Sequence, residues 1–169
     1  MRNICFVVCS ILICICISCN GSSTTSVEAK ENSQAQKNLN SWHLVIKAFA
    51  TGNVDAVDSL IADDYIDHRP MGDVKGKDSV KANIIRFHAT YKDIKMEIIK
   101  ELADNDHGFF WMRGTGNSNG AMGIPAGPFE ITNVQVVKFK DGKAVERWEF
   151  MEMGQLMKMM QQRGRIQAR

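Results

Sequence analysis

Apolar positions recur at helical spacing in the first part of the chain. Leu39, Trp42, Ile46 and Phe49 follow one another at i, i+3, i+7 and i+10, which predicts one buried face of a helix. The sequence 51–53 (Thr-Gly-Asn) is expected to end this helix and to start a second, short one with Val57, Leu60 and Ile61 on its apolar side.

Residues 65–70 leave helical periodicity, because Pro70 biases Arg69 toward extended backbone. A third helix is expected to begin at Asp78 or Ser79. From residue 94 the apolar period changes to two, which predicts strands from residue 94, over 109–116, over 129–139 and over 144–152, and a last helix after Met153. Helices followed by a run of strands favour an α+β fold. We expect one curved, cone-shaped antiparallel sheet wrapped around the N-terminal helices, with an internal cavity.

The dipeptide Asp141-Gly142 predicts a two-residue hairpin turn, which fixes the pairing of the last two long strands. The predicted cross-strand pairs are Phe139 with Ala144, Val137 with Glu146, Gln135 with Trp148, and Asn133 with Phe150. Because side chains alternate along a strand, Glu146, Trp148, Phe150 and Glu152 would share one face. If that face is the inner one, Glu152 is a carboxylate in an apolar cavity and a candidate general base. The alternative is that Glu152 lies in solvent or caps the following helix.

Composition and charge narrow the class of protein. The chain has 169 residues and a formal net charge of +2, which suits one domain and gives no electrostatic case for nucleic acid as a partner. All five cysteines lie at or before residue 19, so the rest of the chain holds no disulfide and no thiolate zinc site. The scattered histidines show no ligand spacing, so no metal is expected.

The N-terminus has the pattern of an export signal. Residues 4–18 form an apolar run after Arg2 that is shorter than the about 20 residues of a spanning helix. Ile17-Ser18-Cys19 resembles the lipobox of bacterial lipoproteins, with Cys19 as the lipid acceptor. We therefore expect a signal peptide over 1–18, the lipidated Cys19 with a flexible tether over 19–36, a domain over 37–164 and a basic tail over 165–169. This places the protein in the bacterial cell envelope, anchored to a membrane through Cys19.

Several short motifs occur in an order that resembles one family. They are Arg113-Gly114-Thr115-Gly116, Met122-Gly123-Ile124-Pro125, Asp141-Gly142-Lys143 followed by Glu146 and Trp148, and, upstream, Tyr65, His68 and Pro70. In this order the motifs resemble the SnoaL-like polyketide cyclases (ester cyclase family) of the nuclear transport factor two-like superfamily. The resemblance covers roughly residues 38–164. It implies the cystatin-like barrel of that superfamily, and dimers are common among similar proteins, so a homodimer is an expectation too.

The resemblance also implies a chemistry. The characterised cyclases use no metal or organic cofactor; an acidic residue removes a proton beside a carbonyl, and the enolate closes a ring. That acid falls four residues after the tryptophan, where this chain has Glu152 in place of aspartate. The positions expected to contact a ligand are Tyr65, His68, Trp111, Arg113, Met122, Ile124, Trp148 and Phe150. For His68 a surface turn stays open, and for Trp111 and Arg113 a core tryptophan with a snorkelling arginine does.

Two functions remain open at this point. The first is an enzyme that binds a small, mostly apolar carbonyl compound and uses Glu152 as the base of a cyclisation or isomerisation. The second is a non-catalytic ligand-binding or assembly lipoprotein that keeps only the fold. The glutamate in place of aspartate at residue 152 and the lipoprotein signal favour the second, because a pathway cyclase would more naturally be cytoplasmic. The shared fold does not decide between them, since one fold hosts many functions.

Overall fold

One mixed sheet of six strands organises the chain. The computed structural model describes residues 22–122 and 124–167. The strands are β1 (Ile61–His68), β2 (Val74–Lys75), β3 (Tyr91–Ala103), β4 (His107–Ser118), β5 (Gly127–Lys140) and β6 (Lys143–Met151). The helices are α1 (Ser22–Thr51), α2 (Val57–Leu60), α3 (Lys77–Thr90) and α4 (Met153–Gln167). Helices and strands are segregated along most of the chain, which confirms the α+β class.

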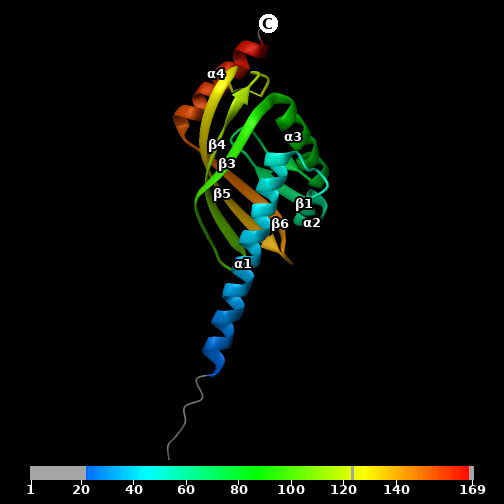
Figure 1. Cartoon of the computed structure of the whole chain (residues 1–169), viewed down its shortest axis with the longest axis vertical. Coiled ribbons are helices and arrows are strands. Elements are labelled where there is room, and N and C mark those ends of the chain that lie inside the picture. Colours follow the sequence, from blue (N-terminus) through cyan, green and yellow to red (C-terminus); the bar gives the residue numbers. More distant parts are fainter. Residues whose placement is uncertain (1–21, 123, 168–169) are drawn as a thin grey trace, which may run out of the picture.

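The order of the strands corrects two expectations about the sheet. It is β2-β1-β6-β5-β4-β3, so β2 and β3 are edges and the curved sheet is not closed into a barrel (Figure 1). The sheet is also not purely antiparallel, because β1 runs parallel to β6. Strand β1 was not predicted: Ile61 was assigned to the short helix, and the exposed Asp63 and Asp64 interrupt the apolar alternation that marks a strand.

Helix α1 crosses the sheet and supplies much of the core. Trp42, Val45 and Ala48 are buried in the core, and the Trp42 ring lies 6.1 Å from that of Phe110 on β4 and 6.5 Å from that of Phe139 on β5. Asn38, one turn earlier, is fully buried and donates from Nδ2 to the carbonyl oxygens of residues 104 and 105 in the β3–β4 turn. This pattern confirms the predicted apolar face of the helix and its end at Thr51.

The N-terminal half of α1 differs from the sequence expectation. The helix begins at Ser22 and extends beyond the sheet, so the residues expected to form a flexible tether up to residue 36 are helical (Figure 1). No glycine or proline lies between residues 22 and 51, and residues 28–36 are rich in Glu, Ala, Lys and Gln, which are good helix formers. The predicted signal peptide and Cys19 lie outside the described residues. No helix in the described part of the chain combines the length and the apolar character needed to span a membrane.

The β5–β6 hairpin begins as predicted and then changes register. Asp141 and Gly142 have φ angles of 51° and 77°, the positive values that a two-residue hairpin turn needs, and Phe139 pairs with Ala144. The next pair is Lys138 with Glu146, so β6 uses two residues where β5 uses one, and Val145 is the extra residue of a β-bulge.

The bulge reverses the inner and outer faces of β6. The predicted pairs of Val137 with Glu146, Gln135 with Trp148 and Asn133 with Phe150 are wrong by one residue, since Arg147 pairs with Val137, Trp148 with Val136, and Phe150 with Val134. A shift of one residue turns each following side chain to the opposite face of the sheet. Arg147, Glu149 and Met151 therefore face inward, while Trp148 and Phe150 face outward.

Candidate functional site

A cavity of about 640 Å³ lies between the inner face of the sheet and the helices α1 and α3. The loop that follows β1 and the loop between β4 and β5 border it as well. Most of its wall is apolar, with aromatic and methionine side chains such as Phe49, Phe87, Met96, Met112, Phe129 and Met159. A site of this size and lining suits a small organic molecule, which is held by apolar contact and oriented by a few polar groups.

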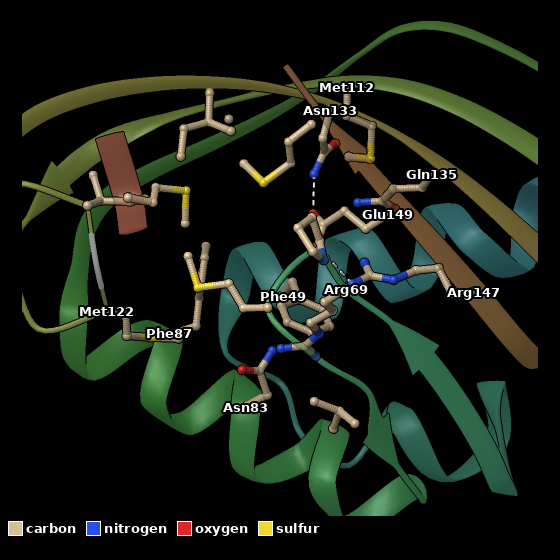
Figure 2. A pocket seen from close by; sticks show the side chains of 18 of the residues that line it. Phe49, Arg69, Asn83, Phe87, Met112, Met122, Asn133, Gln135, Arg147 and Glu149 are labelled. Atoms are coloured by element: carbon tan, nitrogen blue, oxygen red, sulfur yellow. Dashed lines mark hydrogen bonds and ion pairs between the residues drawn. The ribbon is translucent and has the colours of Figure 1, made fainter. Parts of the chain in front are cut away.

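Glu149 on β6 places a carboxylate on the wall of this cavity. Its Oε1 atom accepts a hydrogen bond of 2.5 Å from Nδ2 of Asn133 on β5, and its Oε2 atom lies 3.6 Å from Nη2 of Arg147 (Figure 2). Its side chain is 17% exposed. The bulge at Val145 is what brings this carboxylate inside, since it sets which residues of β6 face inward.

Arg147 links Glu149 to a buried carboxylate behind the cavity wall. Its Nε and Nη2 atoms donate to the two carboxylate oxygens of Asp67 at 2.6 and 3.0 Å, and Nε of Arg69 donates to Asp67 at 2.5 Å. Burial by itself lowers the pKa of Arg147, but the negative charges of Glu149 and Asp67 together with nearby Tyr65 raise it overall, so the guanidinium is always charged. Two cations and two anions thus form one connected network.

Two more hydrogen-bonding features lie near this network: a bond between Trp42 and Gln135 in the cavity wall, and the hydroxyl of Tyr65 in the core. Trp42 on α1 donates from Nε1 to Oε1 of Gln135 at 3.0 Å, and both residues line the cavity. Tyr65 lies close to the arginine network, where burial raises the pKa of its hydroxyl, so it remains a neutral phenol. It is a core residue and does not line the cavity, in contrast to its predicted place in the binding site.

Three of the residues expected to contact a ligand border the cavity. Met122 and Ile124 do so from the loop between β4 and β5. Arg113 borders it from β4, but its side chain lies on the same strand face as Trp111, where its Nη2 atom pairs with Oε2 of Glu97 at 2.8 Å on the neighbouring strand. These placements agree with the expected geometry, whereas ligand contact itself stays a prediction.

The other expected ligand contacts lie on the outer face of the sheet. Phe150 and Trp111 are 57% and 49% exposed, and Trp148 stacks on the ring of His68 at a centroid distance of 5.4 Å. Glu152 is exposed and follows β6, where its carbonyl oxygen accepts from the backbone N–H of Leu156 at the start of α4. The expectation that Trp148, Phe150 and Glu152 face the interior is wrong, because it assumed a regular hairpin without the bulge.

His68 takes part in a separate cluster on that outer face. Its Nε2 atom lies 3.0 Å from Oε1 of Glu146, and its Nδ1 atom lies 3.0 Å from Oδ1 of Asp73. The hydrogen bond with Glu146 raises the pKa of His68 above its ordinary value of 6.5; partial burial lowers it, and Asp73 raises it further. Both ring nitrogens face carboxylates, so the imidazolium, which donates from both, is the favoured form.

The sequence patterns did not single out the polar residues in the cavity wall and directly behind it, which are Asp67, Arg69, Asn83, Asn133, Arg147 and Glu149. Asp67 and Arg69 lie in the segment read as a junction, and Arg147 and Glu149 lie on the strand face that was assigned to the outside. One signal was present: an arginine and a glutamate two residues apart share a strand face, and such a pair next to an apolar cavity is a candidate site.

Comparison with known proteins places the fold. A family model described as "SnoaL-like domain" matches residues 43–147. Among solved structures, TsrD from Streptomyces laurentii is 20% identical, with a TM-score of 0.64 over 74% of this chain and 95% of that one. A putative polyketide cyclase from Streptomyces antibioticus, IdmH, is 22% identical, with a TM-score of 0.61 over 75% and 98%.

A third structure carries a different activity on a similar fold. An LEH-like epoxide hydrolase from Mycobacterium tuberculosis is 12% identical, with a TM-score of 0.63 over 76% of this chain and 87% of that one. At these identities the likeness concerns the fold alone. Among curated proteins, none matches the chain significantly.

Proposed function

The chain belongs to the SnoaL-like domain family, and we propose that it binds a small, mostly apolar carbonyl compound and removes a proton beside the carbonyl, with Glu149 as the base. The observation that carries the proposal is the position of the Glu149 carboxylate on the wall of a largely apolar cavity. A carboxylate within reach of a bound ligand is the group that general-base chemistry needs. The enolate would then close a ring or return the proton at another carbon, without a cofactor.

The neighbours of Glu149 support this role. Asn133 holds one carboxylate oxygen, so the other faces the side of Arg147 and the cavity. The arginine is charged throughout the accessible pH range and can stabilise the oxyanion that forms when the proton leaves. Glu152, the base predicted from the family position, is exposed and does not line the cavity, which is why the proposal moves to Glu149.

The alternative is a binding protein without catalysis. It is favoured by the engagement of Glu149 with both Asn133 and Arg147, because both carboxylate oxygens already have partners within the protein. The two functions share the ligand and the cavity, so they differ only in whether a proton of the bound ligand exchanges.

Deuterium exchange separates the two functions. The purified full chain is mixed in D₂O with methyl 4-(biphenyl-4-yl)-4-oxobutanoate, an aryl ketone with exchangeable protons beside its carbonyl, and exchange is followed by proton NMR. We expect Glu149→Gln to slow the catalysed exchange by about 10²- to 10⁴-fold, the usual contribution of a general base. The matched control Glu152→Gln is expected to exchange at the wild-type rate.

Two results would count against the enzyme. Equal exchange by wild type and Glu149→Gln would show that Glu149 is not the base. Binding of the ester by calorimetry with no exchange above the buffer rate would instead select the non-catalytic function. Glutamine keeps the shape of the side chain and an oxygen for Asn133, so a folding defect is not expected from this variant.

Localisation and partners are proposed on the sequence pattern. The protein would be exported, cleaved after Ser18 and anchored in the bacterial cell envelope by a lipid on Cys19. Helix α1 begins at Ser22, close to this cysteine, so it would form the start of the link between the lipid and the domain. Mass spectrometry of membrane fractions tests the anchor: the lipid mass is expected on the wild type and not on Cys19→Ala.

The outer face of the sheet supports a homodimer. Two adjacent cross-strand rows, called here the outer rows, carry apolar side chains: Leu102, Phe109, Val136 and Trp148 in the first, and Trp111, Val134 and Phe150 in the second. Five of these seven side chains are exposed. Monomeric proteins rarely expose so continuous an apolar patch, and a second copy presents the same surface for pairing.

A further inference from the structure

Asn83 and Arg86 face the cavity from α3, and neither has a partner in the part of the chain that the structure describes. Residues three apart lie on the same side of a helix, and both residues border the cavity together with Phe87. Asn83 is only 6% exposed, yet its Oδ1 atom is buried without a hydrogen-bond partner. Buried polar groups are paired in the great majority of cases, so this unpaired acceptor at the cavity wall indicates a hydrogen-bond donor that the ligand supplies.

The charges of the cavity single out Arg86. The lining residues include four arginines and two carboxylates. Arg147 and Arg69 are bound to Asp67, and Arg113 is paired with Glu97. Arg86 lies exposed at the mouth and forms no ion pair with any residue of the described ranges. Its guanidinium is therefore available to a negative group that enters from solvent.

We infer that the ligand of this cavity carries a carboxylate, which the Arg86 guanidinium binds on the α3 side while its apolar body lies against the aromatic wall. Figure 2 shows Asn83 reaching from α3 into the cavity across from Asn133 and Glu149. A guanidinium donates two parallel hydrogen bonds to a carboxylate, and the Oδ1 atom of Asn83 can accept a hydrogen bond from a hydroxyl or N–H elsewhere on the ligand. The inference rests on the proposed function, since it names the class of ligand for the same cavity.

The arrangement gives the ligand one orientation. Its anionic group would stay at the mouth beside Arg86, and its apolar part would lie against Phe49 and Phe87, whose rings pack edge to face at a centroid distance of 6.0 Å. The carbonyl would then point toward Glu149 and Arg147 at the deeper, opposite wall. A keto acid with an apolar or aromatic body has all of these groups, whereas a neutral ester lacks the one that Arg86 would bind.

A matched pair of ligands tests the inference. Binding of 4-(biphenyl-4-yl)-4-oxobutanoate and of its methyl ester to the purified full chain is measured by isothermal titration calorimetry at low and at physiological salt. We expect the acid to bind at least about tenfold more tightly than the ester, and the difference to shrink as salt is added. In Arg86→Gln the acid is expected to lose most of this advantage while the affinity for the ester is unchanged.

Two control variants keep the test specific. Lys81→Gln removes another cation of α3, but one that pairs with Asp58 and does not line the cavity, so it is expected to leave the preference for the acid intact. Arg86→Lys keeps the charge and is expected to retain part of the preference. Equal affinity of the wild type for acid and ester, or an unchanged preference in Arg86→Gln, would overturn the inference. Neither result would affect the proton abstraction, which the Glu149→Gln exchange experiment tests on the neutral ester.

Discussion

Arg147 and Asp67 form a two-bond ion pair that joins the parallel strands β1 and β6, with contacts of 2.6 and 3.0 Å. The Asp67 side chain is 3% exposed and that of Arg147 is 11% exposed, so water does little to screen the pair. β1 and β6 are the one parallel pair in the sheet, and the cavity wall depends on this junction. The pair therefore connects the stability of the fold with the position of Glu149.

Replacing Asp67 by asparagine is expected to destabilise the protein strongly. The buried Arg147 would lose its principal negative partner, and leaving one charge of a buried pair unmatched typically costs about 3–5 kcal/mol. Urea unfolding followed by circular dichroism measures the change. The control is Lys81→Ala, which breaks an exposed ion pair with Asp58 and should leave the urea midpoint nearly unchanged. A midpoint for Asp67→Asn equal to that of the control would contradict the role assigned to the pair.

The bulge at Val145 is expected to decide which side of β6 faces the cavity. Deletion of Val145 would give the regular hairpin that the turn sequence predicts, with Trp148 and Phe150 inside and with Arg147 and Glu149 in solvent. Because the network around Asp67 would be lost, we expect a fall in melting temperature of more than about 10 °C, or no folded protein.

Val145→Ala is the control for this deletion. It keeps the register and removes only part of one half-buried side chain, so a small loss near 1 kcal/mol is expected. Thermal unfolding by circular dichroism compares the two variants. A deletion variant as stable as Val145→Ala would mean that the register of β6 is not fixed by the bulge.

The bulge also separates the features of this fold that sequence patterns can predict from those that they cannot. Periodicity located all four helices of the described residues and the four long strands β3 to β6, and the Asp141-Gly142 turn predicted the first hairpin pair correctly. Nothing local in the sequence around Val145 signals an extra residue, because a bulge is favoured by the packing of both strands together. Without the bulge, the predicted pairing is wrong by one residue, and the predicted inner and outer faces of β6 are therefore exchanged.

The candidate site was hard to predict for a related reason. Asp67 meets Arg147 across 80 positions of sequence, and their strands pair in parallel, a contact that requires the whole intervening chain to fold. Met122 and Ile124, by contrast, border the cavity, as the resemblance to the SnoaL-like family implied for the loop that contains them, and their contact with a ligand stays a prediction.

The His68 cluster predicts a dependence of stability on pH. The pKa of His68 is raised in the folded protein, chiefly by its hydrogen bond with Glu146, so folding favours the protonated imidazole. The stabilisation is fully present below about pH 6.5, the ordinary pKa of an unfolded histidine, and is lost as the pH rises through the higher folded value. We expect the melting temperature to fall between pH 6 and pH 8 for this reason.

His68→Gln is expected to flatten this part of the profile. Glutamine keeps hydrogen-bonding capacity toward Glu146 or Asp73 but carries no titrating proton. Melting temperatures of wild type and variant at several pH values in one buffer series measure the difference between the two slopes. Parallel profiles would mean that the outer-face cluster makes no contribution to the pH dependence.

The outer rows predict the result of a charge placed at their centre. Trp111 is 49% exposed and pairs across the sheet with Val134, which pairs in turn with Phe150. Trp111→Lys is expected to convert a homodimer into a monomer, because a lysine in the middle of an apolar interface loses its water without gaining a partner. Sedimentation velocity of the full chain at micromolar concentration measures the oligomeric state. Ile85→Lys, on α3 and 62% exposed, is the matched control and should remain dimeric. A wild-type protein that sediments as a monomer, or a Trp111→Lys variant that stays a dimer, would rule out this face as the interface.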